Sequence, residues 1–301
     1  MVSSSQAQPA RFLDHCVLPT ASLAAARKRL DALGFTVAPD AAHPFGTGNC
    51  CIFFADGSYL EPLAVLDEAL AKEAAAEGNV FVARDALFRS ALGEEGFSAL
   101  VLGSGDAAAD HAAFVAAGIS AGAPLSFSRP FTDAAGREAV ASFKLAFAAP
   151  GEREERFFFT CQRVNSPKGG RSGFERHANG VKGIARILAV APTPDAYRDF
   201  FAGFSGSRPT ATAAGGIDLR LSNAGLSVMT PAGFDEAIAA RQSAHGGGLD
   251  LAGILFQVPA LATLRTLLSA GDVLFAEHAG RIGVPPAEGQ GATFIFEESF
   301  P

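Results

Sequence analysis

Two stretches give the strongest indication of the fold: Phe12-Leu13-Asp14-His15-Cys16-Val17-Leu18-Pro19 and, further along, Gly57-Ser58-Tyr59-Leu60-Glu61-Pro62-Leu63. Both are predicted to be β-strands because they are short, largely apolar runs. Each contains a side chain that is costly to bury there, His15 in the first and Glu61 in the second. A charged group inside an apolar strand costs free energy unless it is paired, hydrogen-bonded or bound to a metal. His15 and Glu61 are therefore the first candidates for a functional site.

The chain between these two strands predicts a helix followed by a hairpin. Ser22 is a suitable N-cap, and Gly34 is a suitable residue to end the helix. Apolar residues at helical spacing lie between them, namely Leu23, Ala26, Leu30 and Leu33. Further strands are expected near 36–37 and at 50–54, and Asp56-Gly57 supplies the turn before the strand that carries Glu61. The predicted unit is one strand, one helix and three strands.

The same order of elements recurs in three further units. Their first strands are expected at 97–102, 183–190 and 251–258. Three sequential strands after each helix require antiparallel pairing, unlike a parallel sheet in which strands and helices alternate. A polar, glycine-rich stretch at 165–180 is the best candidate for a linker between two halves. We therefore expect a first domain at 11–164 and a second at 181–301, each made of two units.

The composition argues against several classes of protein. The chain has 301 residues, of which 49% are hydrophobic and 18% charged, so a large core is expected. Its net charge of -7 argues against nonspecific nucleic-acid binding. No apolar run reaches about 18 residues, so no membrane span is expected. The four cysteines form no Cys-x-x-Cys pair, and we expect them to be buried thiols in a reducing cytoplasm.

Five short motifs, together with the tandem units, resemble one known superfamily. They are Leu13-Asp14-His15, His43-Pro44-Phe45-Gly46-Thr47-Gly48-Asn49, Tyr59-Leu60-Glu61, Phe158-Phe159-Thr160-Cys161-Gln162 and His177-Ala178-Asn179-Gly180. The chain resembles the vicinal oxygen chelate superfamily, and within it the glyoxalase-like branch. The resemblance implies an α+β fold in which four βαβββ units pair into two vicinal-oxygen-chelate-like domains with curved mixed sheets. The first half matches through its motifs, and the second half matches only through its unit pattern.

The resemblance also implies up to four metal ligands, one from the first and one from the last strand of each paired unit. The first unit would supply His15 and Glu61. The second would supply Gln162 from its last strand, together with Ser98 or Ala99 from its first. His and Glu are good ligands for Zn, Ni, Mn or Fe, whereas Gln is a weak neutral ligand. His15, Glu61 and Gln162, completed by water or substrate, are the predicted site of a divalent metal.

A second interpretation of His15 and Glu61 needs no metal. If the two side chains are adjacent in one cup, they would form a charge-assisted hydrogen bond poised for proton transfer. A third interpretation gives them a purely structural role. In both chemical interpretations, His15 and Glu61 are the predicted catalytic residues.

Four other residues are candidates for contacts with a substrate. His43 and Asn49 bound a loop that forms either a turn or one wall of the pocket, and this loop lacks the Lys-Ser/Thr ending of a phosphate-binding loop. Arg129 either binds a substrate carboxylate or is exposed or ion-paired. His177 is either a pocket residue or a contact of the linker.

The second half offers no comparable ligand set. The residues nearest its expected ligand positions are Ala185, Val228 and Gly253, none of which can bind a metal. Glu297 alone has a suitable side chain, and one carboxylate without partners is usually a charge at a strand end. We therefore expect the active site in the first half, and packing or formation of a homodimer as the role of the second.

These features predict a glyoxalase-like enzyme of the isomerase, lyase or dioxygenase class that acts on a small organic substrate. The alternative is a metal-free protein that binds or sequesters a small molecule, like the bleomycin-resistance members of the superfamily. The 26 phenylalanines suit the apolar walls of such a cup. One metal bound per chain would favour the enzyme, whereas tight ligand binding without metal would favour the alternative.

Overall fold

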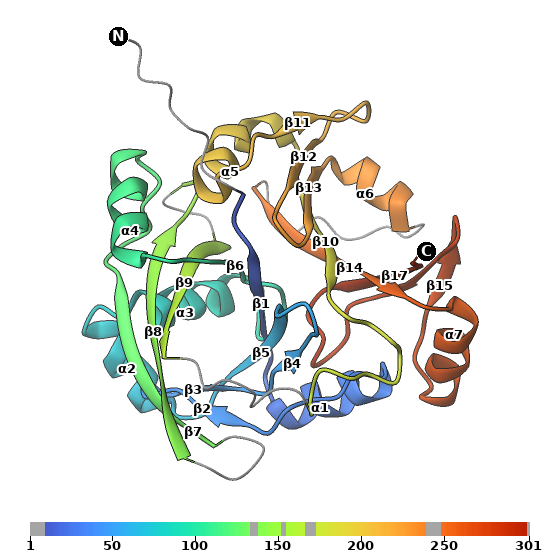
Figure 1. The fold of residues 1–301 in the computed structure, drawn as a ribbon, viewed down its shortest axis with the longest axis horizontal. Coiled ribbons are helices and arrows are strands. Elements are labelled where there is room, and N and C mark those ends of the chain that lie inside the picture. The colour runs from blue at the N-terminus through green and yellow to red at the C-terminus, as the bar shows by residue number, and fades with distance from the viewer. Residues whose placement is uncertain (1–9, 133–137, 152–154, 166–172, 239–247, 300–301) are drawn as a thin grey trace.

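The computed structural model describes residues 10–132, 138–151, 155–165, 173–238 and 248–299, which form two mixed sheets side by side (Figure 1). The strands of the first sheet are β1 (Leu13–Pro19), β2 (Ala41–Ala42), β3 (Thr47–Asn49), β4 (Ile52–Phe53), β5 (Tyr59–Val65), β6 (Ala99–Gly103), β7 (Leu125–Thr132), β8 (Glu138–Ala148) and β9 (Phe157–Asn165). Their order is β2-β3-β5-β1-β6-β9-β8-β7, and β4 pairs with β5.

The second sheet repeats this arrangement with the second half of the chain. Its strands are β10 (Ile184–Val190), β11 (Thr210–Ala211), β12 (Ile217–Arg220), β13 (Gly225–Met229), β14 (Asp250–Val258), β15 (Ala276–His278), β16 (Arg281–Val284) and β17 (Thr293–Glu298). Their order is β11-β12-β13-β10-β14-β17-β16-β15. In each sheet the first strand runs parallel to the last strand of its own unit and antiparallel to the first strand of the next unit.

Helices pack against both faces of the two sheets (Figure 1). They are α1 (Leu23–Ala32), α2 (Glu68–Ala76), α3 (Val80–Leu92), α4 (Ala107–Ala116), a 3-10 turn at Pro194–Tyr197 followed by α5 (Arg198–Ser205), α6 (Pro231–Ile238) and α7 (Leu261–Ala270). The first four begin where a polar side chain accepts a hydrogen bond from a free backbone N–H, which stabilises a helix start by about 1 kcal/mol. These caps are Ser22, Asp67, Asn79 and Asp106.

The pairing of units confirms the predicted fold class, an α+β fold with four repeated units in two mixed sheets. The helix of the first unit is followed by four strands, and the corresponding helix of each other unit by three. The first sheet takes its strands from residues 13–165 and the second from residues 184–298. The domain boundaries themselves remain a prediction, and residues 166–172 of the expected linker lie outside the described part of the chain.

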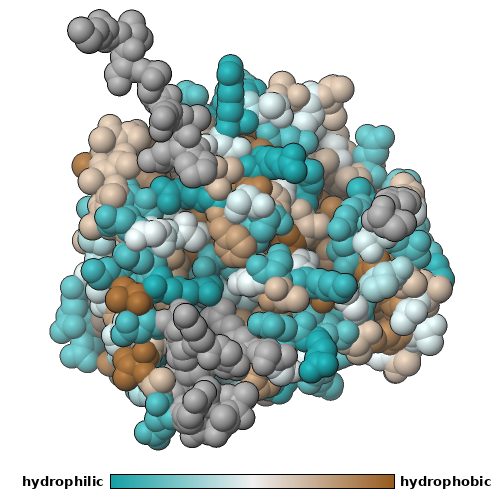
Figure 2. All heavy atoms as spheres, in the orientation of Figure 1, coloured by the Kyte–Doolittle hydropathy of each residue, from teal (hydrophilic) through white to brown (hydrophobic). Residues whose placement is uncertain are grey.

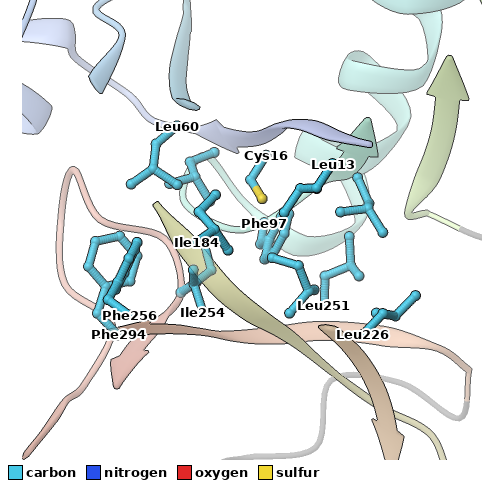
Figure 3. Packing of buried hydrophobic residues seen from close by; sticks show 14 of the residues in the cluster. Leu13, Cys16, Leu60, Phe97, Ile184, Leu226, Leu251, Ile254, Phe256 and Phe294 are labelled. Atoms are coloured by element: carbon cyan, nitrogen blue, oxygen red, sulfur yellow. The ribbon is translucent and has the colours of Figure 1, made fainter. Parts of the chain in front are cut away.

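One apolar core joins the two sheets. Leu13, Cys16 and Leu60 of the first sheet face Ile254 and Phe256 of the second across it (Figure 3). Each large apolar side chain that is fully buried stabilises the fold by about 1.5–3 kcal/mol. Because side chains alternate along a strand, the opposite face of each sheet is left to line a separate cup.

The first cup is the face of the first sheet that is turned away from this shared core. Val17 of β1 and Phe159 of β9 lie in it, whereas their neighbours Cys16 and Phe158 lie in the shared core. Helices α2 and α3 cover it with Ala71, Phe81 and Val82. A second cup on the second sheet contains Leu188, Phe234, Leu255 and Ile295.

On the face of the molecule shown in Figure 2, hydrophilic residues are spread widely and apolar residues form small separate groups. Within the described residues, no helix is both long and apolar enough to cross a membrane.

Candidate active site

His15 lies in the first cup, where its imidazole is almost completely buried at 3% relative exposure. The pairing of β1 with β6 shifts register between Leu13 and His15, which marks a bulge in β1. At this irregularity two consecutive side chains interact, and His15 Nδ1 lies 2.6 Å from Asp14 Oδ1. A carboxylate on one ring nitrogen orients an imidazole and fixes which atom faces the other way. Here that atom is Nε2.

Glu61 faces His15 from the neighbouring strand β5. Its Oε2 lies 3.1 Å from His15 Nε2, so both ring nitrogens of His15 are within hydrogen-bonding distance of a carboxylate. A neutral imidazole carries one N–H, and two such bonds require a proton on each nitrogen. The geometry therefore describes an imidazolium held between Asp14 and Glu61.

Electrostatics agree with this protonation state. Burial by itself lowers the pKa of His15, but its hydrogen bonds to Asp14 and Glu61 outweigh burial and raise that pKa above 6.5. Burial alone would raise the pKa of Glu61, whereas the hydrogen bond and positive charge of His15 bring it down to about 2. Both shifts favour the charged pair.

The second oxygen of Glu61 is held by the end of β3, which follows a short loop from β2. Asn49 Nδ2 donates to Glu61 Oε1 at 2.6 Å and lies 3.4 Å from His43 Nε2. His43 Nδ1 lies 2.9 Å from the Thr47 hydroxyl. These partners assign a neutral His43 that donates from Nδ1 and accepts at Nε2, and burial lowers the pKa of His43 to about 4.

Gly46 makes the conformation of this loop possible. Its φ is +86°, and a Cβ there would lie 2.6 Å from Asp67 O and from Ala71 N. Both Leu66 N and Asp67 N donate to Gly46 O, which ties the loop to the start of α2. The sequence Phe45-Gly46 thus allows the close approach that brings His43 to Glu61.

Aromatic rings and one arginine enclose His15. Tyr59 stacks on the imidazole with ring centroids 4.3 Å apart, and Phe159 contacts it edge-on at 5.6 Å. Arg163 Nη2 donates to Asp14 at 2.8 Å, and its guanidinium lies 5.5 Å from the Tyr59 ring centroid. Sequence reasoning missed Asp14, Tyr59 and Arg163 as site residues. For Arg163 the sequence did contain a signal. Side chains two residues apart on a strand lie on the same face, and Arg163 is two residues after Cys161, which lines the cavity.

A small cavity of about 30 Å³ lies beside His15 and Glu61. Such a volume holds one or two water molecules, so an organic substrate must displace part of the lining. Arg129 reaches this cavity from β7, and its guanidinium lies 6.0 Å from the Phe143 ring centroid. The lining is mainly aromatic, with Phe45, Phe81, Phe127, Phe143 and Phe159.

Two residues predicted for the site lie elsewhere. Gln162 is on the opposite face of β9, where its amide donates to Gly105 O at 2.9 Å and accepts from Ala107 N at 3.1 Å at the start of α4. The prediction for Gln162 is therefore wrong by one residue, since Cys161 occupies the position of β9 that faces the cup.

His177 is a contact of the connecting segment and not a pocket residue. Its Nδ1 accepts a hydrogen bond from Thr36 N at 3.0 Å, and its Nε2 lies 3.1 Å from Phe53 O. It also lies edge-on to the rings of Phe35 and Phe54 in the shared core. Of the two alternatives for His177, the structure supports the structural one.

The donors around His15 do not fit the metal site that the resemblance implies. With Gln162 outside the cup, the second unit presents Ala99 and Val101 of β6, which have no side-chain donor, and Cys161 of β9, whose thiol belongs to no group of three ligating side chains among the described residues. His43 Nε2 is 3.6 Å from Glu61 Oε1, but the Asn49 amide nitrogen is close to both atoms. The amide N–H of Asn49 thus already uses Glu61 Oε1 as its acceptor. Within the described residues, no group of three or more His, Cys, Asp or Glu side chains could hold a metal ion.

Comparison with known proteins identifies the family. A family model described as "Glyoxalase-like domain" matches residues 13–203, more than half of the chain. The chain belongs to this family. The match includes both His15 and Glu61 and ends within α5. No curated protein matches the chain.

Solved structures share the fold of this glyoxalase-like chain at low sequence identity. A hypothetical protein from Staphylococcus aureus is 14% identical, with a TM-score of 0.68 over 95% of this chain and 99% of that one. A mutant 4-hydroxymandelate synthase from Streptomyces coelicolor is 14% identical, with a TM-score of 0.61 over 97% and 93%. A halotolerant catechol dioxygenase is 12% identical, with a TM-score of 0.55 over 97% and 87%. At these identities the similarity shows the fold alone, which is that of the vicinal oxygen chelate superfamily.

Proposed function

We propose that this glyoxalase-like protein is an enzyme that moves protons on a small α-hydroxy carbonyl compound, with His15 as the acid and Glu61 as the base. The observation that carries the proposal is the position of the His15 imidazole between Asp14 and Glu61, at 2.6 and 3.1 Å. An acid and a base at hydrogen-bonding distance beside a cavity can act together on one substrate.

In the proposed reaction, the substrate carbonyl oxygen replaces Glu61 Oε2 as the acceptor of the His15 Nε2 proton. Glu61 removes the proton from the carbon that carries the hydroxyl group, while His15 protonates the carbonyl oxygen. A C–H bond breaks, an O–H bond forms, and the product is an enediol. Glu61 then returns its proton to the former carbonyl carbon and the other hydroxyl proton passes to His15. The net reaction is an isomerisation that restores both residues.

The two proton transfers assist each other. The hydrogen bond from His15 and its positive charge are the main reasons for the low pKa of Glu61, since burial alone would raise that pKa. When His15 gives its proton to the substrate, this charge disappears and Glu61 becomes a stronger base. Asp14 holds His15 in place throughout, and Arg163 neutralises Asp14.

The walls of the cavity favour a substrate with an apolar body. Phe127, Phe143 and Leu145 line it, and Arg129 adds a guanidinium to the lining. A guanidinium pairs well with a carboxylate, so Arg129 would orient a substrate that carries one. Because the cavity is small, binding requires these side chains to move apart.

No step of this reaction is assigned to a metal, because the donors around His15 do not fit one. The family resemblance nevertheless implies a divalent metal, so metal dependence must be measured directly. We expect activity to persist after dialysis against EDTA and not to increase when Zn²⁺, Ni²⁺, Mn²⁺ or Fe²⁺ is added.

Hydrogen–deuterium exchange at carbon tests the proposal. We expect the protein to accelerate exchange of the methylene protons of 2-hydroxyacetophenone in D2O, followed by ¹H NMR, and to act faster on its 4-carboxy analogue. Glu61→Gln should abolish the acceleration, and Glu138→Gln, an exposed glutamate of β8, should not. Equal acceleration by Glu61→Gln would contradict the proposal. Saturable binding by the wild type without any exchange would instead favour a protein that sequesters its ligand.

A further inference from the structure

The second sheet has a cup of its own, and its cavity is larger than that of the first. The cavity measures about 290 Å³, against about 30 Å³ beside His15. This volume is close to the lower end of the range for small-molecule sites. Small side chains leave the space open, among them Ala214, Gly216, Gly233 and Ala237.

Arg186 and Ser227 occupy the positions in this cup that His15 and Glu61 occupy in the first. In the first sheet His15 is paired with Tyr59, and Glu61 lies two residues further along β5. In the second sheet Arg186 is paired with Gly225, and Ser227 lies two residues further along β13. The sequence prediction had placed Ala185 and Val228 at these positions, one residue away in each case. The second cup is therefore not devoid of polar groups at its ligand positions.

The guanidinium of Arg186 is held through Nη1, and the edge formed by Nε and Nη2 is available to a ligand. Its Nη1 donates to Ser227 Oγ at 2.8 Å and lies 3.4 Å from Asp218 Oδ1. No described residue accepts a hydrogen bond from its Nε or Nη2. Gly225 makes room for the guanidinium, because a Cβ there would lie 2.8 Å from Arg186 Cζ.

Arg281 of β16 supplies a second guanidinium to the same cavity. It is paired with Glu297, with Nη2 and Oε2 2.8 Å apart. The charged residues that line the cavity are Arg186, Arg281 and Asp218, and Glu297 offsets the charge of Arg281. Apolar side chains complete the wall, including Leu188, Leu255 and Ile295.

We propose that the second cup is a binding site for a small monocarboxylate with an apolar body. The carboxylate pairs with the available edge of Arg186, which matches the planar geometry of a carboxylate. The apolar body lies against Leu188, Leu255 and Ile295. The available N–H groups of Arg186 bind an anion by charge-assisted hydrogen bonds, which a neutral molecule of the same shape makes more weakly. This site is independent of the reaction proposed for the first cup.

Met229 provides a direct test, because it lines the second cavity and the chain has just 2 methionines, Met1 and Met229. In protein labelled with ¹³C at the methionine methyl group, titration with benzoate should shift the Met229 signal to saturation. Benzyl alcohol, which has a similar body without the charge, should bind at least about tenfold more weakly, the effect expected from losing a charge-assisted hydrogen bond.

Variants locate the site. Arg186→Gln should weaken the benzoate response of Met229 at least about tenfold, and Arg186→Lys, which keeps the charge without the fork, should fall between it and the wild type. Arg220→Gln, an exposed arginine of β12, and Arg129→Gln in the first cup should leave the response unchanged. A Met229 signal that does not move, or that moves equally with benzyl alcohol or in a folded Arg186→Gln variant, would overturn the proposal. Loss of the response in Arg129→Gln alone would assign benzoate to the first cup and overturn it as well.

Discussion

The two cups share one backbone plan and differ in the residues at two strand positions. In the first, His15 meets Glu61 and is stacked on Tyr59, in a cavity of about 30 Å³. In the second, Arg186 meets Ser227 beside Gly225, in a cavity of about 290 Å³. His15 and Glu61 can transfer protons near neutral pH. Arg186 keeps its proton, so it can bind an anion but cannot transfer a proton. The scaffold positions the side chains, and their chemistry decides what each cup can do.

The largest expected effect separates the cups by activity. Glu61→Gln should reduce catalysed exchange about 10²–10⁴-fold, the usual contribution of a general base. Ser227→Ala, the equivalent change in the second cup, should leave exchange in the first cup unchanged. Rates of solvent exchange measured by ¹H NMR with both variants check this, and a comparable loss in Ser227→Ala would mean that the two cups act together.

Asp14→Asn should cause the largest loss of stability. It leaves Arg163 without its carboxylate partner and His15 without its charge-assisted bond, both in a buried site. Breaking a buried ion pair by removing one partner costs about 3–5 kcal/mol in the free energy of unfolding. Urea unfolding measures this cost. Asp195→Asn, which removes a half-exposed pairing with Arg198, should cost less than about 1 kcal/mol. Similar values for the two variants would show that the charged cluster around His15 is not formed.

The pH dependence of stability should show one limb for each histidine of the first cup. Burial lowers the pKa of His43 to about 4, so between pH 4 and 6.5 the unfolded chain binds the proton more readily and stability rises with pH. The pKa of His15 is raised, so its contribution is complete below pH 6.5 and is lost as pH rises through the higher folded value. Wild-type stability should therefore peak near pH 6.5 on account of these two groups.

Variants assign the two limbs. His43→Gln should remove an acid limb of about 3 kcal/mol, and His15→Gln should remove the alkaline limb. His278→Gln, an exposed histidine of β15, should keep both. Urea unfolding at several pH values provides the data, and an acid limb that survives in His43→Gln would show that His43 is not held neutral.

The smallest effect is expected from Glu297→Gln in the second half. Glu297 pairs with a partly exposed Arg281, so its loss should cost less than about 1 kcal/mol of stability. It should leave exchange and ligand binding in the first cup unchanged. A large loss of either function in a folded variant would show that the assignment of the active site to the first half is wrong.

The sequence was sufficient for the fold and for the central pair of the site. Helix spacing, glycine positions and hairpin turns gave the units, and Glu61 lies near His15 because the first and last strands of a unit are neighbours. The predictions that failed concerned the face of a strand on which a side chain lies. Since side chains alternate with a period of two, an error of one residue moves a side chain to the other face of the sheet, and this explains the outcomes for Gln162 and Val228.

Other site residues depended on contacts that no local pattern reveals. Asp14 faces His15 because of a bulge in β1, and a strict alternation would have placed it on the other face. Asn49 reaches Glu61 from the end of β3, and Gly46 allows the loop before this strand to approach α2 closely. Arg163 comes from a strand of the other unit. Such contacts between distant segments arise only when the sheet is assembled.

The central claim is that His15 is an imidazolium held between two carboxylates. Nitrogen-15 NMR of histidine-labelled protein measures this directly, because the shifts of Nδ1 and Nε2 distinguish imidazolium from either neutral tautomer. At pH 7 we predict that both nitrogens of His15 carry a proton and that His43 is neutral with its proton on Nδ1, with Asp14→Asn lowering the pKa of His15. A neutral His15 at pH 7, with one unprotonated nitrogen facing Glu61, would contradict the account.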